Sequence, residues 1–380
     1  MKKLCCFFNY NPLYRYPIYH AMDKELDCDF YFGDSVFEPL KQFDPHTLKG
    51  YKKSLHAIRI FRSYQWHSGA ISLLKGYSDY LITGQFEYLT NWCIILYAKL
   101  TGKRVYCWTH GVASPTTRKR QQRLIEKIFF NCMDGILMYN NYRVPYMTEM
   151  GIKKEAISVI HNSLNTSLQT SIYKRLMPSA IYTDHFRNEY PTIIYIGRIQ
   201  KRKKVDMLIE AVSMLHHDHY PINLVLVGDI MEGVTIKSQI MEKGLDPFVW
   251  FYGPCYEEEK NAELLYNAAA CVCPAEVGLT AIHALSYGTP VISNNDFETQ
   301  MPEFEAIQEG VTGSFYLTDD IKSLAHEIHR WTNVTPKERD AIRENSRKEI
   351  VASWSVSYQI EVLKRTFSTH ILEKDKMTLS

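Results

Sequence analysis

Short apolar runs alternate with amphipathic helical patterns along almost the whole chain, and this alternation is the strongest constraint on its fold. Runs with strand character fall at Leu4–Phe8, Phe30–Phe32, Tyr80–Ile82, Val105–Trp108, Gly135–Met138, Ile157–Ile160, Thr192–Ile196, Asn223–Val227, Phe248–Tyr252 and Ala270–Cys273. Helical patterns such as Thr90–Leu100, Lys203–His216 and Glu257–Ala269 separate them. This order predicts parallel sheets built from right-handed βαβ units, and therefore an α/β fold.

The alternation is interrupted by a polar, irregular stretch between Tyr173 and Tyr190. A chain of 380 residues is also long for one hydrophobic core and suits two domains. We therefore expect one doubly wound domain at 1–165, a linker at 166–190, a second doubly wound domain at 191–350 and a C-terminal helix with its tail at 351–380.

The C-terminal segment carries its own signal. Trp354, Tyr358, Val362 and Leu363 are spaced to form one apolar face of a last helix. An apolar helix face of this kind is expected to be buried against another element of the protein. We expect the helix to cross back to the first domain.

The composition indicates a globular protein without a bias toward nucleic acid. The net charge is +2, and hydrophobic and charged residues make up 46% and 23% of the chain. The nine cysteines form no CxxC pair, and four of them (Cys5, Cys6, Cys271 and Cys273) lie inside strand-like runs. We expect buried, reduced thiols, no metal site and a reducing cytoplasm. The N-terminal apolar run is too short for a signal peptide, and no stretch is long enough to span a bilayer.

The segment from Ala270 to Ile292 predicts an anion site. A short apolar strand ends at Pro274, Gly278 opens a helix, and Gly288-Thr289-Pro290 ends that helix before the strand Val291–Ile292. Such a turn points backbone N–H groups and the positive end of a helix toward a ligand. We expect residues 274–279 to hold a phosphate-bearing substrate.

A second segment predicts binding of the same ligand. Gly197 ends a strand and permits close backbone approach, Arg198 offers a planar fork for phosphate oxygens, and Lys203 adds a point charge. The cations at 201–204 would oppose the dipole of the helix they open, so we expect an anion to compensate them. Gly228 and Gly253-Pro254 follow two neighbouring strands and complete one rim, with 253–256 as a wall for a nucleotide base.

Two polar features stand out in the first half. His110, in Trp108-Thr109-His110-Gly111, directly follows a strand and is either structural or a group that reaches into a cleft. Arg15 lies beyond Asn9-Tyr10-Asn11-Pro12, the turn after the first strand, and these residues form a comparable rim.

A basic helix is predicted over Thr117–Cys132. Its cations are Arg118, Lys119, Arg120, Arg123 and Lys127, with Glu126 as the single acid. Leu124, Ile128 and Phe129 supply an apolar face. The helix either packs on its own sheet with a solvated outer face or contacts an anionic membrane surface.

Taken in order, these segments resemble the nucleotide-sugar-binding domain of the retaining glycosyltransferases of family four, which have the GT-B fold. The resemblance rests on GRIQKRKKVDMLIEA (197–211), LVLVGD (224–229), FYGP (251–254), 274–292 and PEFEAIQEGVTG (302–313), and it covers most of 191–315. The first half matches more loosely, through WTHG around His110 and IHNSLN at 160–165. The resemblance implies two Rossmann-like domains that face an inter-domain cleft.

The resemblance also implies roles for single residues. Arg198 and Lys203 resemble the pair that grips the donor pyrophosphate, and His110 resembles a histidine near the sugar on the acceptor side. The backbone at Val277-Gly278-Leu279 would face the sugar or the phosphates.

Two positions depart from the family pattern. The family has two glutamates in the segment that follows the strand at 270–273; here the first falls on Ala275, with Glu276 one place along, and the second is His283. A histidine can still hydrogen-bond one ribose hydroxyl. The candidate catalytic residues are therefore His110, Arg198, Lys203 and Glu276, and His283 joins the candidate donor contacts.

The activity implied is a metal-independent transfer, with retention, of a sugar from a UDP- or GDP-type donor to a hydroxyl. We expect no cofactor, a glycan or lipid-linked acceptor in surface polysaccharide synthesis, and a cytoplasmic protein that is peripheral at the inner membrane face. Two alternatives remain open. One is a nucleotide-sugar epimerase or phosphorylase of related architecture, and the other is a non-catalytic scaffold that binds nucleotide or lipid.

Overall fold

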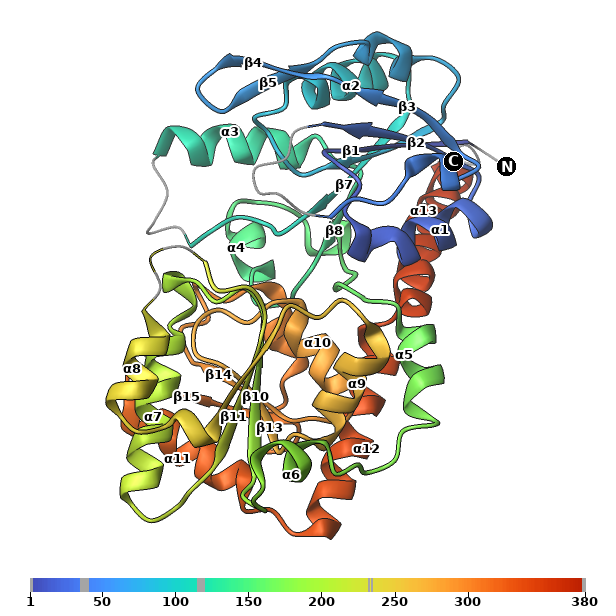
Figure 1. The fold of residues 1–380 in the computed structure, drawn as a ribbon. Coiled ribbons are helices and arrows are strands. Elements are labelled where there is room, and N and C mark those ends of the chain that lie inside the picture. The colour runs from blue at the N-terminus through green and yellow to red at the C-terminus, as the bar shows by residue number, and fades with distance from the viewer. Residues whose placement is uncertain (1–2, 35–40, 115–119, 232, 234, 378–380) are drawn as a thin grey trace. The chain divides into compact units, whose positions relative to one another are not determined.

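The chain divides into two compact units, each described by itself. The computed structural model describes residues 3–34, 41–114, 120–231, 233 and 235–377. Unit 1 contains the chain up to Leu164 and again from Val356 onward, and unit 2 is Asn165–Ser355. Each unit contains a parallel sheet with helices on both faces (Figure 1).

Unit 1 contains a seven-stranded parallel sheet in the order β3-β2-β1-β6-β7-β8-β9. The strands are β1 (Leu4–Phe8), β2 (Cys28–Gly33), β3 (Tyr51–Leu55), β6 (Asp79–Thr83), β7 (Arg104–Thr109), β8 (Gly135–Met138) and β9 (Ile157–Val159). A separate antiparallel hairpin consists of β4 (Ala57–Phe61) and β5 (Tyr64–His67).

In the described part of unit 1, the helices that cover the sheet are α1 (Tyr16–Glu25), α2 (Leu89–Leu100), α3 (Arg120–Asn131), α4 (Val144–Glu149) and α13 (Val356–Met377). Side chains along a strand alternate between faces, so Cys5 and Phe7 pack with α2, α3 and α4. Cys6 and Phe8 pack with α1 and α13 on the other face. The predicted return of the last helix to the first domain is confirmed, because α13 belongs to unit 1.

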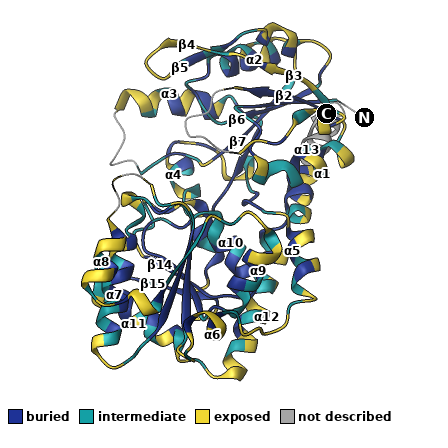
Figure 2. Cartoon of the chain, viewed as in Figure 1, coloured by how far each residue is buried: buried dark blue, intermediate teal, exposed yellow. Residues whose placement is uncertain are grey.

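Unit 2 contains a six-stranded parallel sheet in the order β12-β11-β10-β13-β14-β15. The strands are β10 (Thr192–Ile196), β11 (Asn223–Val227), β12 (Val249–Gly253), β13 (Ala270–Cys273), β14 (Val291–Asn294) and β15 (Gly313–Tyr316). The central strands are buried on both faces (Figure 2), which is why they read in the sequence as continuous apolar runs.

The helices of unit 2 are α5 (Thr166–Tyr173), α6 (Ile181–Phe186), α7 (Val205–His217), α8 (Ile236–Glu242), α9 (Glu258–Asn267), α10 (Leu279–Ser286), α11 (Ile321–Thr332) and α12 (Pro336–Ser353). Apolar side chains of α7, α8 and α11 form one core cluster with the sheet. Helices α9, α10 and α12 lie on the opposite face (Figure 1).

Each sheet has a point where the strand order reverses. In unit 1 it lies between β1 and β6, and in unit 2 between β10 and β13. In open α/β sheets, ligands bind outside the carboxyl ends of the strands at this point, because the following loops diverge there and leave a crevice. Both reversals are therefore places to look for a site.

Several features differ from the sequence expectations. The segment 166–190 is not a separate linker, because it forms α5 and α6 within unit 2. Trp354 follows α12 in unit 2 and lies outside α13, where only Tyr358, Val362 and Leu363 of the predicted face are found. The cations at 201–203 form a short 3-10 turn ahead of α7 and are not its first residues.

The nine cysteines are free, and six of them, including the four in strand-like runs, are buried, as expected. Within the ranges described above, no helix combines the length and the apolar character needed to cross a membrane.

Candidate functional site

Three successive strands of unit 2 end in glycines whose backbones are joined. The Gly197 N–H donates to the Val227 carbonyl (2.9 Å), and the Gly228 N–H donates to the Gly253 carbonyl (3.0 Å). A Cβ on Gly228 would lie 2.0 Å from the Gly197 carbonyl oxygen, so only glycine fits there. The strand ends at 197, 228 and 253 therefore form one rim, and Pro254 lies exposed beside it.

The turn after β13 is held rigidly. The Val277 N–H donates to Gln300 Oε1 (2.7 Å), and Gln300 Nε2 donates in turn to Ser293 Oγ (3.0 Å) and to the Asn294 carbonyl (2.9 Å). Gly278 is the N-cap of α10, which begins at Leu279 and has no side-chain cap. The first N–H groups of a helix have no partner within it, so this turn presents donors at a positive helix end.

The basic segment reaches this turn from the neighbouring strand. Lys203 Nζ donates to the Glu276 carbonyl oxygen (2.9 Å) and lies 3.0 Å from Glu276 Oε1. The Arg202 guanidinium contacts the same carboxylate, and Lys204 pairs with Asp319. In the structure, protein carboxylates compensate these cations. From the sequence we expected a bound anion in that role.

A cavity of about 50 Å³ brings several of the predicted residues together. Its lining includes Gly197, Lys203, Glu276, Val277 and Gly278. The lining follows β10 and β13, so the cavity lies at the strand reversal of unit 2. A lysine amino group and a helix N-terminus meet in this cavity, together with glycines that let the backbone approach a ligand closely. These groups suit a small anionic ligand. Arg198 does not line this cavity; its carbonyl accepts a hydrogen bond from Tyr195 (3.0 Å) at the start of the same loop.

His283 is held by a carboxylate that the sequence analysis did not single out. Its Nε2 lies 3.1 Å from Glu258 Oε1, which also accepts hydrogen bonds from Tyr287 (2.6 Å) and Gln169 (3.1 Å). Burial acts to raise the pKa of Glu258, but the hydrogen bonds from His283, Tyr287 and Gln169 outweigh it and lower the pKa to about 2. The available sequence signal was the run of glutamates 257–259 at the start of a predicted helix.

Glu303 is buried in the 3-10 turn Pro302–Ala306. Its Oε2 lies 4.0 Å from the position that a Cβ of Gly278 would take. The carboxylate therefore faces the Gly278 turn, from the loop that follows β14.

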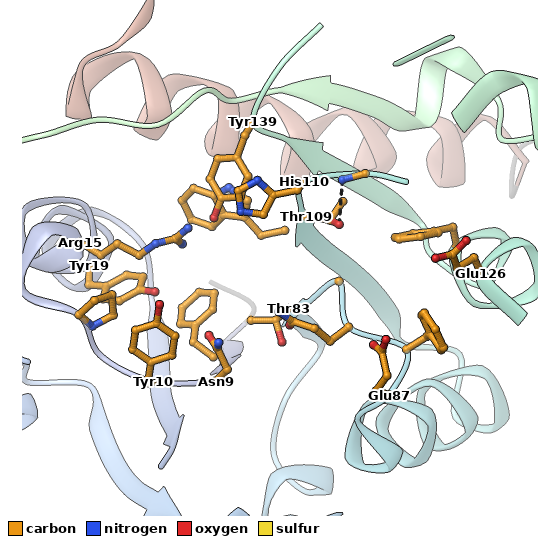
Figure 3. A pocket seen from close by; sticks show the side chains of 18 of the residues that line it. Asn9, Tyr10, Arg15, Tyr19, Thr83, Glu87, Thr109, His110, Glu126 and Tyr139 are labelled. Carbon is orange, nitrogen blue, oxygen red and sulfur yellow. Dashed lines mark hydrogen bonds between the residues drawn. The ribbon is translucent and has the colours of Figure 1, made fainter. Parts of the chain in front are cut away.

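Unit 1 has a pocket of about 320 Å³ at its own strand reversal (Figure 3). Residues at or just after the ends of β1, β6 and β7 line it, among them Asn9, Thr83 and His110. Arg15 and Tyr139 form one side of the pocket in Figure 3, and Glu87 and Glu126 lie at the opposite side. Glu126 is only 3% exposed and lines this pocket. The sequence analysis had placed it as the single acid of a basic helix.

His110 lies in this pocket beside other rings and cations. The centroid of its ring lies 4.5 Å from that of Tyr139. Although the residue is exposed at the pocket mouth, partial loss of water around the ring and repulsion by Arg15 and Arg143 lower the pKa of His110 to about 4. The imidazole is therefore neutral at pH 7 and can both donate and accept a hydrogen bond.

The chain is similar to known proteins in sequence and in fold. Residues 183–349, most of unit 2, match the model of the family described as glycosyl transferases group 1. An uncharacterized 41.2 kDa protein in the cps region of Klebsiella pneumoniae is 25% identical over 281 residues, which is 70% of this chain and 73% of that protein.

Two solved structures resemble the chain over nearly its full length. HepE from Anabaena, solved in complex with UDP, has a TM-score of 0.72 at 15% identity and covers 97% of this chain and 100% of its own. The lipopolysaccharide outer core galactosyltransferase WaaB, solved in its apo form, has a TM-score of 0.68 at 15% identity, with 97% and 99% covered. The chain has the GT-B fold. The predicted pair of doubly wound, Rossmann-like halves of a GT-B protein is thereby confirmed, and together with the family match it supports a glycosyltransferase.

The side chains described offer no group of three or more His, Cys, Asp or Glu residues that could hold a metal ion.

Proposed function

We propose that the chain is a retaining glycosyltransferase of the family-four type that transfers a sugar from a nucleoside diphosphate to a hydroxyl of a glycan or lipid-linked acceptor. One observation carries the proposal. Lys203, Gly197 and the Gly278 turn line one cavity at the strand reversal of unit 2, within the segment that matches the glycosyltransferase family model. The neighbours from a cps region and from lipopolysaccharide synthesis suggest surface polysaccharide synthesis as the setting.

In this proposal the diphosphate of the donor binds between the basic loop and the helix end. Arg198 and Lys203 hold its oxygens, and Gly197, Val277, Gly278 and Leu279 let the backbone approach. The rim of Gly228, Gly253 and Pro254 faces the nucleotide. The HepE structures with UDP and with UDP-glucose favour a UDP-type donor, with GDP as the other candidate.

Glu276 would compete with the donor diphosphate for the cations of the site. In the structure its carboxylate holds Lys203 and Arg202. A diphosphate with higher charge would compete for both cations, and Glu276 would then be released toward the substrate. His283 contributes one hydrogen bond to the ribose, with Glu258 fixing its ring.

The reaction forms a bond from the acceptor oxygen to the anomeric carbon and breaks the bond from that carbon to the diphosphate, which leaves with the electron pair. The acceptor proton passes to the leaving phosphate, so no dedicated side-chain base is needed. Arg198 and Lys203 stabilise the charge that develops on the diphosphate, a role for which other enzymes use a metal ion. We therefore propose metal-independent transfer, with His110 neutral and positioned on the acceptor side.

The first test is a thermal-shift screen against UDP-, GDP-, ADP- and dTDP-sugars, with and without EDTA. A ligand at a hundred times its Kd stabilises the folded chain by about 2.7 kcal/mol, which is readily measured. We expect one nucleotide to raise the Tm with no effect of EDTA. A shift abolished by EDTA would contradict metal independence, and no shift with any donor would favour the non-catalytic scaffold.

The second test removes the two proposed cations. Arg198→Ala with Lys203→Ala should weaken nucleotide binding by about two orders of magnitude or more, because each charge-assisted hydrogen bond contributes about 1.5–3 kcal/mol. Calorimetric titration of the selected donor measures the loss. The control, Lys174→Ala with Lys348→Ala, removes two exposed cations of unit 2 outside the basic loop and should bind normally. Equal affinities in the two double variants would show that the diphosphate site has been misplaced.

A further inference from the structure

We propose that the pocket of unit 1 binds an acceptor sugar that carries one anionic group, and that Arg15 holds this group. That this sugar is an acceptor rests on the proposed function. That the pocket binds an anionic sugar rests on the pocket alone. Nothing in the comparisons assigns a ligand to this pocket.

Arg15 is surrounded by aromatic rings and not by acids. Its guanidinium carbon lies 5.2 Å from the ring centroid of Trp108, 5.1 Å from that of Tyr139 and 5.7 Å from that of Tyr14. Its Nε donates to the Tyr14 hydroxyl (3.3 Å). Among the carboxylates in the described ranges, none forms an ion pair with Arg15. A guanidinium has five N–H donors, so it retains capacity for a bidentate carboxylate or phosphate.

Arg15 is also the one residue of the described lining that carries a permanent positive charge. His110, the other basic residue there, is neutral at physiological pH because its pKa is lowered to about 4. An anion that enters the pocket therefore finds its permanent cation in Arg15; Arg143 lies near His110 but does not line the pocket.

The opposite side of the pocket is acidic. Figure 3 shows Glu87 and Glu126 across the pocket from Arg15, and carboxylates there can accept hydrogen bonds from sugar hydroxyls. A ligand with charge at both ends would be repelled by these glutamates, and a neutral sugar would leave Arg15 without an anion. A sugar ring with one anionic group can place that group at Arg15 and its hydroxyls at the two glutamates.

The walls and the size fit such a ligand. The volume of about 320 Å³ lies at the small end of the range for ligand pockets, about 300–1,000 Å³. Three lining residues, Thr83, Gln85 and Trp108, each have a buried polar atom without a hydrogen-bond partner in the described chain. Such atoms are rare in folded proteins, and a buried water is their usual partner.

The test compares three sugars on the full chain: glucose, glucuronate and glucose 6-phosphate, with affinities from saturation-transfer NMR titrations. We expect at least one anionic sugar to bind about tenfold more tightly than glucose, since hydrogen bonds to a charged group are the stronger kind. The two anionic arms distinguish a carboxylate from a phosphate as the group that Arg15 holds. Equal affinities for all three sugars would overturn the proposal.

Variants connect the preference to one side chain. Arg15→Gln should remove the preference, and Arg15→Lys should keep part of it, because the charge remains while the planar fork is lost. Arg59→Gln, in the exposed hairpin of unit 1, is the matched control and should keep all of it. An anion preference that survives in Arg15→Gln would overturn the role of Arg15.

UDP binding provides the second readout on every variant. Unchanged UDP affinity in Arg15→Gln shows a folded chain and separates Arg15 from donor phosphates, whereas its loss in a folded variant would contradict the proposal. If the wild type prefers anionic sugars but binds no nucleotide, the proposed function fails and this inference stands. If nucleotide binds and glucose matches glucuronate and glucose 6-phosphate, this inference alone fails.

Discussion

At the scale of single residues, two carboxylates explain how the site of unit 2 is held. Glu276 joins Lys203 to the turn before α10, because its carbonyl and its carboxylate both contact the lysine. Glu258 fixes His283 and Tyr287 in the same way. Such pairs reduce the motion of side chains that would contact a ligand, so less ordering is left to occur on binding.

Three histidines of unit 1 predict an acid-sensitive fold. Loss of water around the ring lowers the pKa of His67, His110 and His161 to about 4, from an ordinary value of 6.5, and repulsion by Arg15 and Arg143 adds to the shift at His110. The unfolded chain then binds protons that the folded chain does not, so stability is fully present above about pH 6.5 and is lost as the pH falls toward 4. For the fully buried His67 the loss reaches about 3 kcal/mol, and melting temperatures between pH 7 and pH 4 measure it.

The variant His67→Gln should reduce this pH dependence, whatever its stability at neutral pH. His217→Gln is the control, because its side chain is 90% exposed. The same decline of Tm with acid in His67→Gln and in the wild type would contradict the assignment.

At the scale of elements, α3 is divided between core and surface. Phe129 and Phe130 are buried in the core of unit 1, but Leu124 and Ile128 are 59% and 50% exposed. Of the predicted apolar face of Leu124, Ile128 and Phe129, only Phe129 is therefore buried. Arg120 and Lys127 are exposed on the same helix, and Arg123 is partly exposed. Arg118 and Lys119 lie outside the described residues.

We propose that this surface of α3 contacts an anionic membrane, which would place the protein at the cytoplasmic face. Exposed apolar groups beside cations favour such contact, since each cation near anionic lipid contributes about 1 kcal/mol. Leu124→Ser with Ile128→Ser should lower binding to phosphatidylglycerol vesicles at least about tenfold in flotation experiments, because apolar burial is lost.

Leu317→Ser with Val351→Ser, which changes two exposed apolar residues of unit 2, is the matched control. Binding of the wild type to neutral phosphatidylcholine at the same level, or unchanged binding of the α3 variant, would favour the solvated helix.

At the scale of the whole molecule, unit 1 is assembled from both ends of the chain. Helix α13 returns to it after unit 2 is complete, and Ile360, Val362 and Leu363 share a buried cluster with Ile18 and Tyr19 of α1. Stability of unit 1 therefore depends on a helix that follows unit 2 in the sequence.

Val362→Asp should destabilise unit 1 selectively, because it places a charge in that cluster and removes about 1.5–3 kcal/mol of apolar burial. Hydrogen exchange followed by mass spectrometry should show faster exchange in α1 and β9, with unit 2 unchanged. The neighbouring exposed position provides the control, Glu361→Ala. Equal acceleration in both units would contradict the division of the chain.

Several strands buried on both faces were determined by the sequence alone. β1, β8, β10, β11 and β13 have the predicted bounds, because apolar residues in an unbroken short run can be satisfied only inside a covered sheet. Strands β3, β4, β5 and β15 were missed. Most residues of β3 and β4 are exposed and carry no such pattern.

The partners of the site side chains were decided by the tertiary structure. Lys203 and Glu276 lie 73 residues apart and meet because the loops after β10 and β13 leave the sheet at its strand reversal. Glu126 is on a helix that reads as basic and solvated, yet the packing of α3 on its sheet directs it into a pocket wall. Apolar periodicity reports the environment of one element at a time, whereas these contacts depend on how separate elements pack, which local patterns do not encode.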